Sequence, residues 1–194
     1  MHIVHIDARS IVVDKPAGLL AVPGRTEPDC VLAQVQVGHP EALVVHRLDQ
    51  ATSGLLLFAR TPEAQREFSA DFAERRIAKR YVALVGGDLA ESGQCDLPLM
   101  ADWPRRPRQK VDIQHGKPST TRWRVLTSSP DGIRRVELEP VTGRSHQLRV
   151  HLLALGCPIV GDALYGGAPA HRLMLHATWL RLADGLQLHC PPPF

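Results

Sequence analysis

The chain has 194 residues, of which 44% are apolar; this is enough for one domain with its own core and too few for two well-developed domains. The formal net charge of +3 is mildly basic, which allows a nucleic-acid partner without requiring one. No apolar run approaches the ~20 residues that span a bilayer, and the four cysteines lack CxxC spacing, so we expect a soluble, cytoplasmic protein without disulfides.

The first predicted element is a short buried strand at Ile11–Val13. It ends in a Lys-Pro-x-Gly turn, because Pro16 has no N–H to donate and Gly18 can take a positive φ. The stretch "CVLAQVQV", residues 30–37, predicts a short helix. The continuous apolar run "GLLLFAR", residues 54–60, predicts a central strand that is covered on both faces.

A longer helix is predicted in "TPEAQREFSADFAERR". Thr61 is the expected N-cap and Pro62 the first helical residue. Apolar residues spaced by four predict its buried face: Ala64, Phe68 and Phe72. Arg75 and Arg76 are expected in its last turn, where cations suit the negative end of the helix dipole.

The second half of the chain predicts mainly strands. These are "AKRYVALVGG" (78–87), "TRWRVL" (121–126), "RRVELEP" (134–140) and "LMLHATWLRL" (173–182). One helix is predicted in "SHQLRVHLLALG", through Leu148, Leu152 and Leu155, with Gly156 as its C-cap. Strands outnumber helices and follow one another through short turns, so the expected fold class is α+β with a mixed or antiparallel sheet.

Asp49 is the first candidate site residue, in "VHRLDQATSGLLLFAR". It lies where a loop enters the apolar strand, a position that suits a nucleophile or a general base at the rim of a cleft. Alternatively, its carboxylate caps the turn through the amides of Thr52 and Ser53. Local sequence leaves both interpretations open.

Arg149 is the second candidate, because it lies inside the largely apolar helix "QLRVHLLAL". A half-buried guanidinium needs a carboxylate partner, and Asp49 at a strand end is a suitable one, since pairing would keep it ionised. The alternative is that Arg149 extends along the surface with its charge in water.

Two further features suit contact with RNA. Tyr81 follows a basic run that includes Lys79, and it can stack on a base or hydrogen-bond a substrate, although most strand tyrosines are simply packed. In "DWPRRPRQK" four cations lie around Trp103 and two prolines: Arg105, Arg106, Arg108 and Lys110. Phosphate contact is one interpretation of this patch, and a solvated loop is the other.

No cofactor or metal is expected. The chain has no Walker loop, GxGxxG, HExxH or Cys/His quartet, and "HRLD" lacks the other kinase motifs. His146 and His151 are five residues apart, which would place them on different helix faces.

Three motifs together resemble the RluA-type RNA pseudouridine synthases: "HRLDQATSGLLLFAR", "AKRYVALV" and "PVTGRSHQLRVHLLALGCPIVGDALYG". The resemblance implies one catalytic domain over residues 1–194, without a separate N-terminal RNA-binding domain. It also implies a central, mostly antiparallel sheet flanked by helices and loops, with the active-site cleft across the sheet. The implied reaction breaks the N-glycosidic bond of uridine in RNA, turns the uracil and rejoins it through carbon.

The resemblance also implies roles for individual residues. Asp49 is the essential carboxylate, Tyr81 the stacking and proton-handling aromatic, and Arg149 the ion-pair partner of Asp49. Arg47 fills the space left by the flipped-out nucleotide. The full set of expected substrate-binding residues is His46, Arg47, Thr52, Lys79, Arg105, Arg106, Arg108, Lys110, Arg144 and His146.

Three first steps fit these residues: attack of Asp49 on the ribose anomeric carbon, attack on C6 of uracil, or proton removal from the ribose with formation of a glycal. "DLPLMADWPRRPRQKV" is similar to the subgroup that modifies both the tRNA anticodon loop and a loop of 23S rRNA, so these RNAs are the expected partners of a monomeric enzyme. The alternatives are a synthase for only one of these RNAs, an RNA-binding or RNA-folding protein with incidental chemistry, and a glycoside hydrolase. The last would need a second catalytic acid, which the sequence does not mark.

Overall fold

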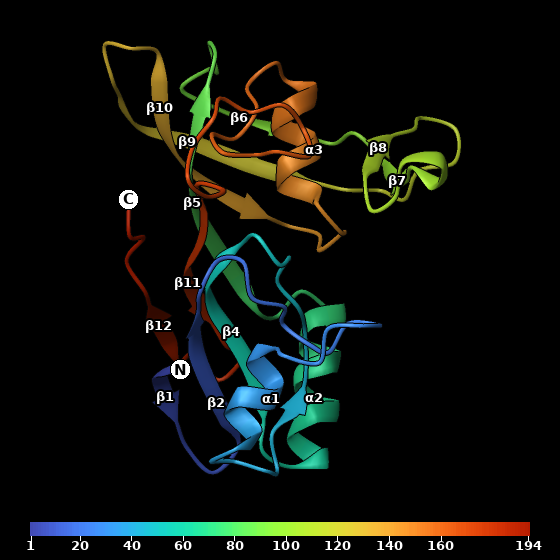
Figure 1. Ribbon diagram of the computed structural model, residues 1–194, viewed down its shortest axis with the longest axis vertical. Helices are drawn as coiled ribbons and strands as arrows, with labels where there is room; N and C mark the ends of the chain where they lie inside the picture. Colours follow the sequence, from blue (N-terminus) through green and yellow to red (C-terminus); the bar gives the residue numbers. More distant parts are fainter. The chain divides into compact units, whose positions relative to one another are not determined.

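The computed structural model describes all 194 residues, from Met1 to Phe194 (Figure 1). The chain divides into two compact units. The first unit contains residues 1–79 and 176–194, and the second contains residues 80–175. No helix in either unit has the length and apolar character needed to cross a membrane.

The first unit is built on a mixed group of strands. They are β1 (His2–Ile6), β2 (Ser10–Lys15), β3 (Leu43–Val44), β4 (Ser53–Ala59), β11 (Leu175–Arg181) and β12 (Gln187–His189). Their order is β1-β2-β4-β11, with β3 paired to β4 and β12 paired to β11. The β4–β11 pair is parallel and the other pairs are antiparallel.

The centre of this unit is β4, as its apolar run predicts. All seven residues of β4 are buried, and Ile11, Val12 and Val13 of the neighbouring β2 are fully buried. Both predicted strands are therefore confirmed. A strand buried on both faces needs an unbroken apolar sequence, because no side chain in it reaches water.

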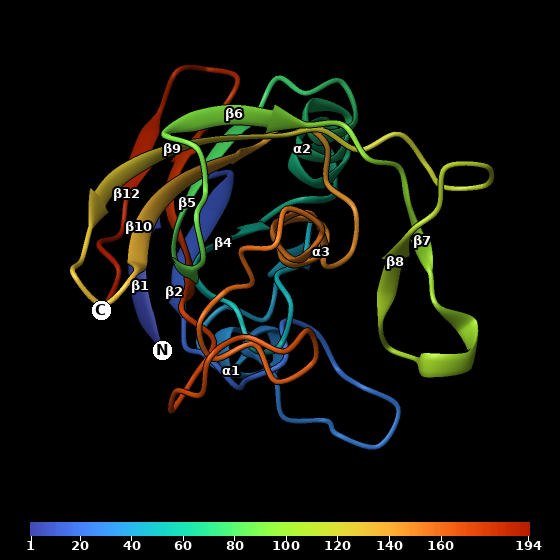
Figure 2. The same ribbon diagram turned by 90° about the horizontal axis from the view of Figure 1, so that it is seen from above.

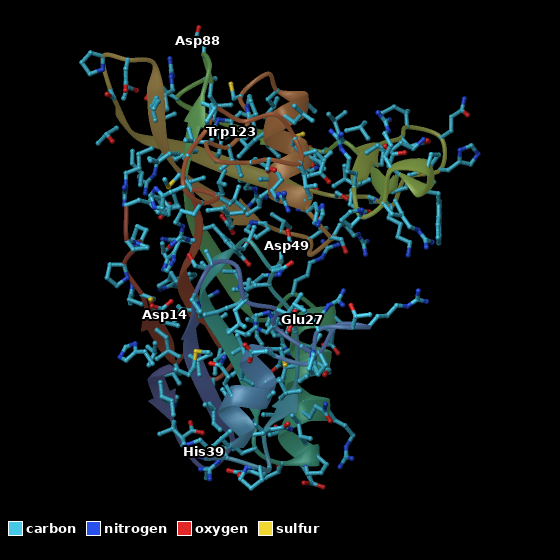
Figure 3. All side chains as sticks on the ribbon, in the orientation of Figure 1. Asp14, Glu27, His39, Asp49, Asp88 and Trp123 are labelled. Carbon is cyan, nitrogen blue, oxygen red and sulfur yellow. The ribbon has the colours of Figure 1, made fainter.

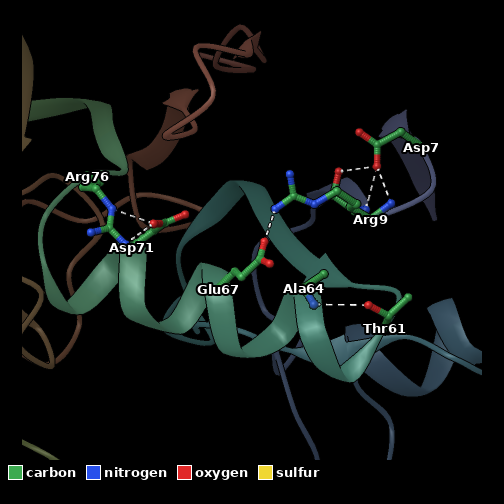
Figure 4. Close-up of polar contacts among 8 residues, drawn as sticks. Asp7, Arg9, Thr61, Ala64, Glu67, Asp71 and Arg76 are labelled. Atoms are coloured by element: carbon green, nitrogen blue, oxygen red, sulfur yellow. Dashed lines mark hydrogen bonds and ion pairs between the residues drawn. The ribbon is translucent and has the colours of Figure 1, made fainter.

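Two helices complete the first unit, α1 (Val31–Gln36) and α2 (Pro62–Ala73). In α2 the hydroxyl of Thr61 accepts the N–H of Ala64, and Pro62 opens the helix (Figure 4). Phe68 packs with Leu55 and Leu57 of β4 in one apolar cluster. The predicted start and buried face of α2 are thus confirmed.

The predicted end of α2 is wrong. The helix stops at Ala73, and Arg75 follows it with a φ of 61°, in the left-handed region. The N–H of Arg76 then donates to the carbonyl of Asp71 (2.8 Å), which closes a Schellman-type end with arginine where glycine is usual. Arg76 also pairs with the carboxylate of Asp71 from outside the helix (Figure 4).

The second unit contains four antiparallel strands, a separate strand pair and one helix. Its elements are β5 (Ala78–Gly86, which begins in the first unit), β6 (Ser92–Cys95), β7 (Leu99–Ala101), the 3-10 turn η1 (Trp103–Arg105), β8 (Gln109–Val111), β9 (Thr121–Ser128), β10 (Ile133–Pro140) and α3 (Gln147–Ala154). The strand order is β5-β10-β9-β6. β7, η1 and β8 form an arm, named here the basic hairpin, that extends away from these four strands in both views (Figures 1 and 2).

The helix predicted near residue 150 is confirmed as α3, and its end is shorter than its leucine spacing suggests. All residues from Gln147 to Leu152 are buried, whereas Leu155 lies beyond the helix and is 37% exposed. Gly156 follows with a φ of 74° and ends the helix. The strands predicted at 78–87, 121–126, 134–140 and 173–182 are β5, β9, β10 and β11.

The four cysteines are buried and unpaired, two in each unit: Cys30, Cys95, Cys157 and Cys190. Strands dominate both units and helices are few, so the predicted α+β class is confirmed.

Candidate functional site

Asp49 lies at the end of the segment that leads into β4 and is half-buried (Figure 3). The main-chain carbonyl of Asp49 accepts the N–H of Thr52 (3.1 Å), which closes a tight turn. Thr52 and Ser53 are each 2% exposed, so the turn descends directly into the core. The carboxylate is thus carried by a short turn anchored on the most buried strand of the unit.

The turn is tied to the end of β2 by a buried ammonium group. Lys15 is fully buried, and its Nζ donates to the carbonyls of Pro16 (2.8 Å), Gln50 (2.9 Å) and Thr52 (2.7 Å). The N–H of Gly18 donates to the same carbonyl of Gln50 (2.9 Å). Lysine has three N–H donors. Here they bond to three carbonyls, two of which belong to residues just after Asp49, so Lys15 holds the turn of Asp49 in place.

The start of β4 is fixed by its neighbour β11. Ser53 Oγ lies 2.7 Å from Nδ1 of the buried His176. Gly54 has a φ of 107°, and a Cβ at this position would lie 2.3 Å from the carbonyl oxygen of Ala177. Glycine is therefore required for the close approach of the two strands.

His46 and Lys79, both in the first unit, each lie close to the ring of Phe72. The N–H of Leu57 donates to Nε2 of His46 (3.1 Å), and the ring centroids of His46 and Phe72 are 4.6 Å apart. Burial and the Lys79 charge lower the pKa of His46 to about 3, so its imidazole is neutral near pH 7. Burial also lowers the pKa of Lys79, whose Nζ lies 5.4 Å from the Phe72 centroid. Arg47, in contrast, is exposed.

In the second unit Arg149 is 4% exposed, so the guanidinium is buried as predicted and the alternative that its charge extends into water is excluded. Its Nε and Nη2 donate to the two carboxylate oxygens of Asp162 at 2.8 and 2.7 Å, in a bidentate pair. Oδ1 of Asp162 also accepts the main-chain N–H groups of Leu164 (3.1 Å) and Tyr165 (3.2 Å). The same carboxylate thus orients the guanidinium and holds the following turn.

Sequence reasoning missed Asp162. The available signal was its position in "GDALYG", because an Asp between glycines commonly caps a turn. Its pairing with Arg149 depends on contacts that local sequence does not contain.

The start of α3 is held in an unusual backbone conformation. His146 precedes the helix with a φ of 54°, and a left-handed conformation costs a non-glycine residue about 1–2 kcal/mol. Gln147 stabilises this segment: its Oε1 accepts from Thr142 Oγ1 (2.6 Å) and from the N–H of Arg144 (3.0 Å). The side chain of Arg144 is exposed and donates to the carbonyl of Pro118 (3.2 Å).

The two histidines near α3 belong to different networks. His146 lies 2.7 Å from the hydroxyl of Tyr165 through Nδ1. His151 is fully buried and contacts Thr121 Oγ1 and the carbonyl of Leu97, each at 2.9 Å. Burial lowers the pKa of His151.

Tyr81 lies in β5, opposite Leu138 of β10, and is 8% exposed. It belongs to the second unit with Arg149, whereas Asp49 belongs to the first unit.

Each cation of the basic hairpin has a neighbour within the second unit. Arg105 pairs with Asp102 (2.8 Å) and Lys110 with Asp112 (3.1 Å). The guanidinium carbon of Arg106 lies 3.3 Å from the ring centroid of Trp103, and that of Arg108 lies 5.3 Å from the ring centroid of Tyr165. Trp103 is 63% exposed, so an aromatic surface with an attached cation faces solvent.

One further cluster has the residue types of a metal site. Ligand atoms of Asp14, His176 and Cys190 lie within 4.8 Å of one another. Both nitrogens of His176 are already hydrogen-bonded, to Ser53 and to the carbonyl of Cys190. Burial and the neighbouring Asp14 raise the pKa of the Cys190 thiol to about 12, so it stays protonated. The donor set therefore fits a hydrogen-bonded network better than a metal ion.

Comparisons with known proteins agree with one another. A family model described as RNA pseudouridylate synthase matches residues 9–154. The "Dual-specificity RNA pseudouridine synthase RluA" of Yersinia pestis is 49% identical over 187 residues, covering 93% of this chain and 91% of that protein. The Pasteurella multocida protein of the same name is 44% identical over 206 residues, covering 100% and 94%. Among solved structures, "Human RNA Pseudouridylate Synthase Domain Containing 1" is similar with a TM-score of 0.85 and 31% identity, covering 100% of this chain and 84% of that one.

Proposed function

Since the chain belongs to the RNA pseudouridylate synthase family, it is an isomerase that converts uridine to pseudouridine in RNA, and we propose that Asp49, Tyr81 and Arg149 carry this reaction. The observation that carries the proposal is the turn of Asp49. A half-buried carboxylate stands on a turn that is fixed by the buried Lys15 and by the fully buried β4. Catalysis needs such a group to be placed before substrate arrives.

The reaction needs two groups, a carboxylate and a residue that can take up and release a proton. The N1–C1′ bond of uridine breaks, a C5–C1′ bond forms, N1 gains a proton and C5 loses one. Asp49 acts in the first of these steps as nucleophile or base. Tyr81 handles the proton that leaves C5, because its hydroxyl can donate and accept.

Arg149 is proposed as the ion-pair partner of Asp49 during the reaction, as the family resemblance implies. A guanidinium carries five N–H donors. The carboxylate of Asp162 accepts one from Nε and one from Nη2 of Arg149. The bidentate pair with Asp162 supports this role, because it fixes the plane of the guanidinium in advance. The Arg149 side chain then loses less conformational entropy when it binds a second carboxylate.

RNA binding is assigned to the cations that the sequence singled out. The target base must leave its stack, which costs a few kcal/mol. Arg47 is exposed, next to His46, and can occupy the space that the base leaves. The basic hairpin supplies phosphate contacts, with Trp103 as a stacking surface, and Thr52, Lys79, Arg144 and His146 complete the proposed contact set.

Two RNA classes are proposed as substrates, the tRNA anticodon loop and a loop of 23S rRNA. The relatives that cover nearly the whole chain are named dual-specificity enzymes, which supports a similar breadth here. We further propose that residues 1–194 act as one catalytic domain, because the family match runs through both units. The enzyme acts as a monomer in the reducing cytoplasm, where four unpaired thiols are stable.

Tritium release from RNA labelled at uracil C5 tests the catalytic role of Asp49. Asp49→Asn keeps the shape of the side chain and removes its charge. We expect wild-type protein to release tritium from tRNA and from 23S rRNA transcripts, and Asp49→Asn to be slower by at least about a thousandfold.

The matched control is Asp131→Asn, in the exposed turn between β9 and β10, which should retain wild-type activity. Release by Asp49→Asn at the wild-type rate would contradict the assignment. Release from only one RNA would narrow the substrate proposal to that RNA, and free uracil among the products would indicate hydrolysis instead.

A further inference from the structure

The side chain of Tyr165 joins the basic hairpin to the start of α3. Its hydroxyl accepts the main-chain N–H of Gln109 in β8 (2.8 Å) and lies 2.7 Å from Nδ1 of His146. Tyr165 is 4% exposed, so both contacts are sheltered from water. We propose that Tyr165 is a positioning residue for the isomerisation, which couples RNA held by the basic hairpin to the helix end that carries Arg149. This role rests on the functions proposed above for Arg149 and the hairpin.

The chemistry of the hydroxyl allows it to hold both neighbours at once. A tyrosine hydroxyl has one proton to donate and lone pairs to accept. It accepts the N–H of Gln109, and it donates to or accepts from Nδ1 of His146 according to the imidazole tautomer. In either tautomer the two hydrogen bonds of the hydroxyl hold the hairpin and the start of α3 at one separation.

His146 is a residue whose conformation needs such support. Its left-handed backbone persists only where the surroundings hold it. Its side chain makes no capping hydrogen bond to α3, while its carbonyl accepts the N–H of Val150 (3.0 Å) as the first turn of the helix. The contact with Tyr165 therefore acts on the residue from which α3 begins.

The ring of Tyr165 connects the same two elements through their arginines. The guanidinium carbons of Arg108 and Arg149 lie 5.3 and 5.0 Å from its centroid, within the usual range of a cation–π contact. Asp162, which pairs with Arg149, also accepts the N–H of Tyr165. A displacement of Tyr165 would therefore act on Arg149 directly, through the ring contact, and indirectly, through Asp162.

The hairpin and α3 also pack against each other. A pocket of about 230 Å³ lies between them, lined by Arg105 of the hairpin and Leu153 of α3 among others. A small apolar cluster of Leu99, Val150 and Tyr165 also joins them. Because the ring of Tyr165 belongs to this cluster and its hydroxyl bonds to β8, its side chain is well placed to set the angle of the hairpin.

Tyr165→Phe tests the role, because it removes the hydroxyl and keeps the ring in the apolar cluster. The probe is unmodified tRNA transcript carrying tritium at uracil C5. We expect the single-turnover rate constant at saturating RNA to fall about tenfold. The Kd for this RNA should change by less than about twofold, and the slope of log Kd against log salt should not change, because no phosphate contact is removed.

The matched control is Ser119→Ala, which removes another buried hydroxyl of the second unit. Ser119 Oγ donates to the carbonyl of Lys117 (2.9 Å), within one segment of chain. It should retain the wild-type rate. A wild-type rate in Tyr165→Phe, a rise in Kd that accounts for the lost rate, or an equal loss in Ser119→Ala would each overturn the role of Tyr165 alone. Absence of tritium release by the wild-type protein would overturn the proposed function and, with it, this role.

Discussion

At the scale of single residues, Lys15 contributes to stability and to the placement of the site. Its buried Nζ satisfies the carbonyls of Pro16, Gln50 and Thr52, and leaving buried carbonyls without a donor is expensive. We expect Lys15→Met to lower the free energy of unfolding by about 2–3 kcal/mol in urea titrations. Lys117→Met, at an exposed position, should change it by less than about 0.5 kcal/mol. Equal losses in the two variants would contradict this account of Lys15.

His46 makes the stability of the protein depend on pH. Its pKa is about 3 in the folded chain, whereas an unfolded histidine has a pKa of about 6.5. Below pH 6.5 the unfolded chain therefore binds a proton that the folded chain does not, so stability falls as the pH drops from about 6.5 towards 3. We expect His46 to account for a loss of about 2 kcal/mol between pH 7 and pH 5.

Urea unfolding of wild-type protein and His46→Gln at pH 7 and pH 5 measures this contribution. Gln has an uncharged oxygen that can accept the N–H of Leu57, and it does not titrate. His151, whose pKa is also lowered, is present in both proteins, so its effect cancels. The same pH dependence in both proteins would show that His46 is protonated as easily in the folded chain as in the unfolded one.

Local sequence was sufficient to find some site residues and not others. Asp49 stands out because it directly precedes a turn and a run of apolar residues. Lys15 and Asp162 do not stand out, because their partners are 35 and 13 residues away along the chain. The role of Tyr81 came from the family resemblance, whereas a carboxylate partner for Arg149 was already expected from its apolar helix. The action of both residues on the same uridine stays a prediction.

At the scale of elements, the N-cap of α2 makes a contribution to the free energy of unfolding that can be measured by itself. Thr61 Oγ1 accepts the N–H of Ala64 (3.1 Å), so Thr61→Ala should lower the free energy of unfolding by about 1 kcal/mol. Ser69→Ala is the control: it removes an exposed hydroxyl that bonds within the helix, to the carbonyl of Gln65, and should have little effect. Both values come from denaturant unfolding, and an equal loss in Ser69→Ala would contradict a capping role.

Helix starts were more predictable than helix ends. Thr61 and Pro62 are specific signals for the start of α2, and the structure confirms them. Its end depends on Arg75 adopting a left-handed conformation that no residue preference indicates. Likewise Leu155 continues the leucine spacing of α3, yet the helix has already ended at Ala154.

At the scale of the whole molecule, the fold class could be predicted because each strand has a recognisable sequence pattern. The apolar run of β4, the alternation in β10 and the glycine stops after β5 are all local, and together they indicate α+β. The division into two units, in contrast, could not be predicted from local sequence. Its boundaries fall inside β5 and β11, where no Pro-, Gly- or Ser-rich linker marks them.

The four buried thiols have a practical consequence for the dynamics of this enzyme. Cys30 and Cys190 belong to the first unit, and Cys95 and Cys157 to the second. A buried thiol reacts with an alkylating reagent only when the structure around it opens, so its labelling rate reports the free energy of that opening. Each unit thus carries two native reporters, and mass spectrometry of timed alkylation can compare their opening with and without RNA in the unmodified protein.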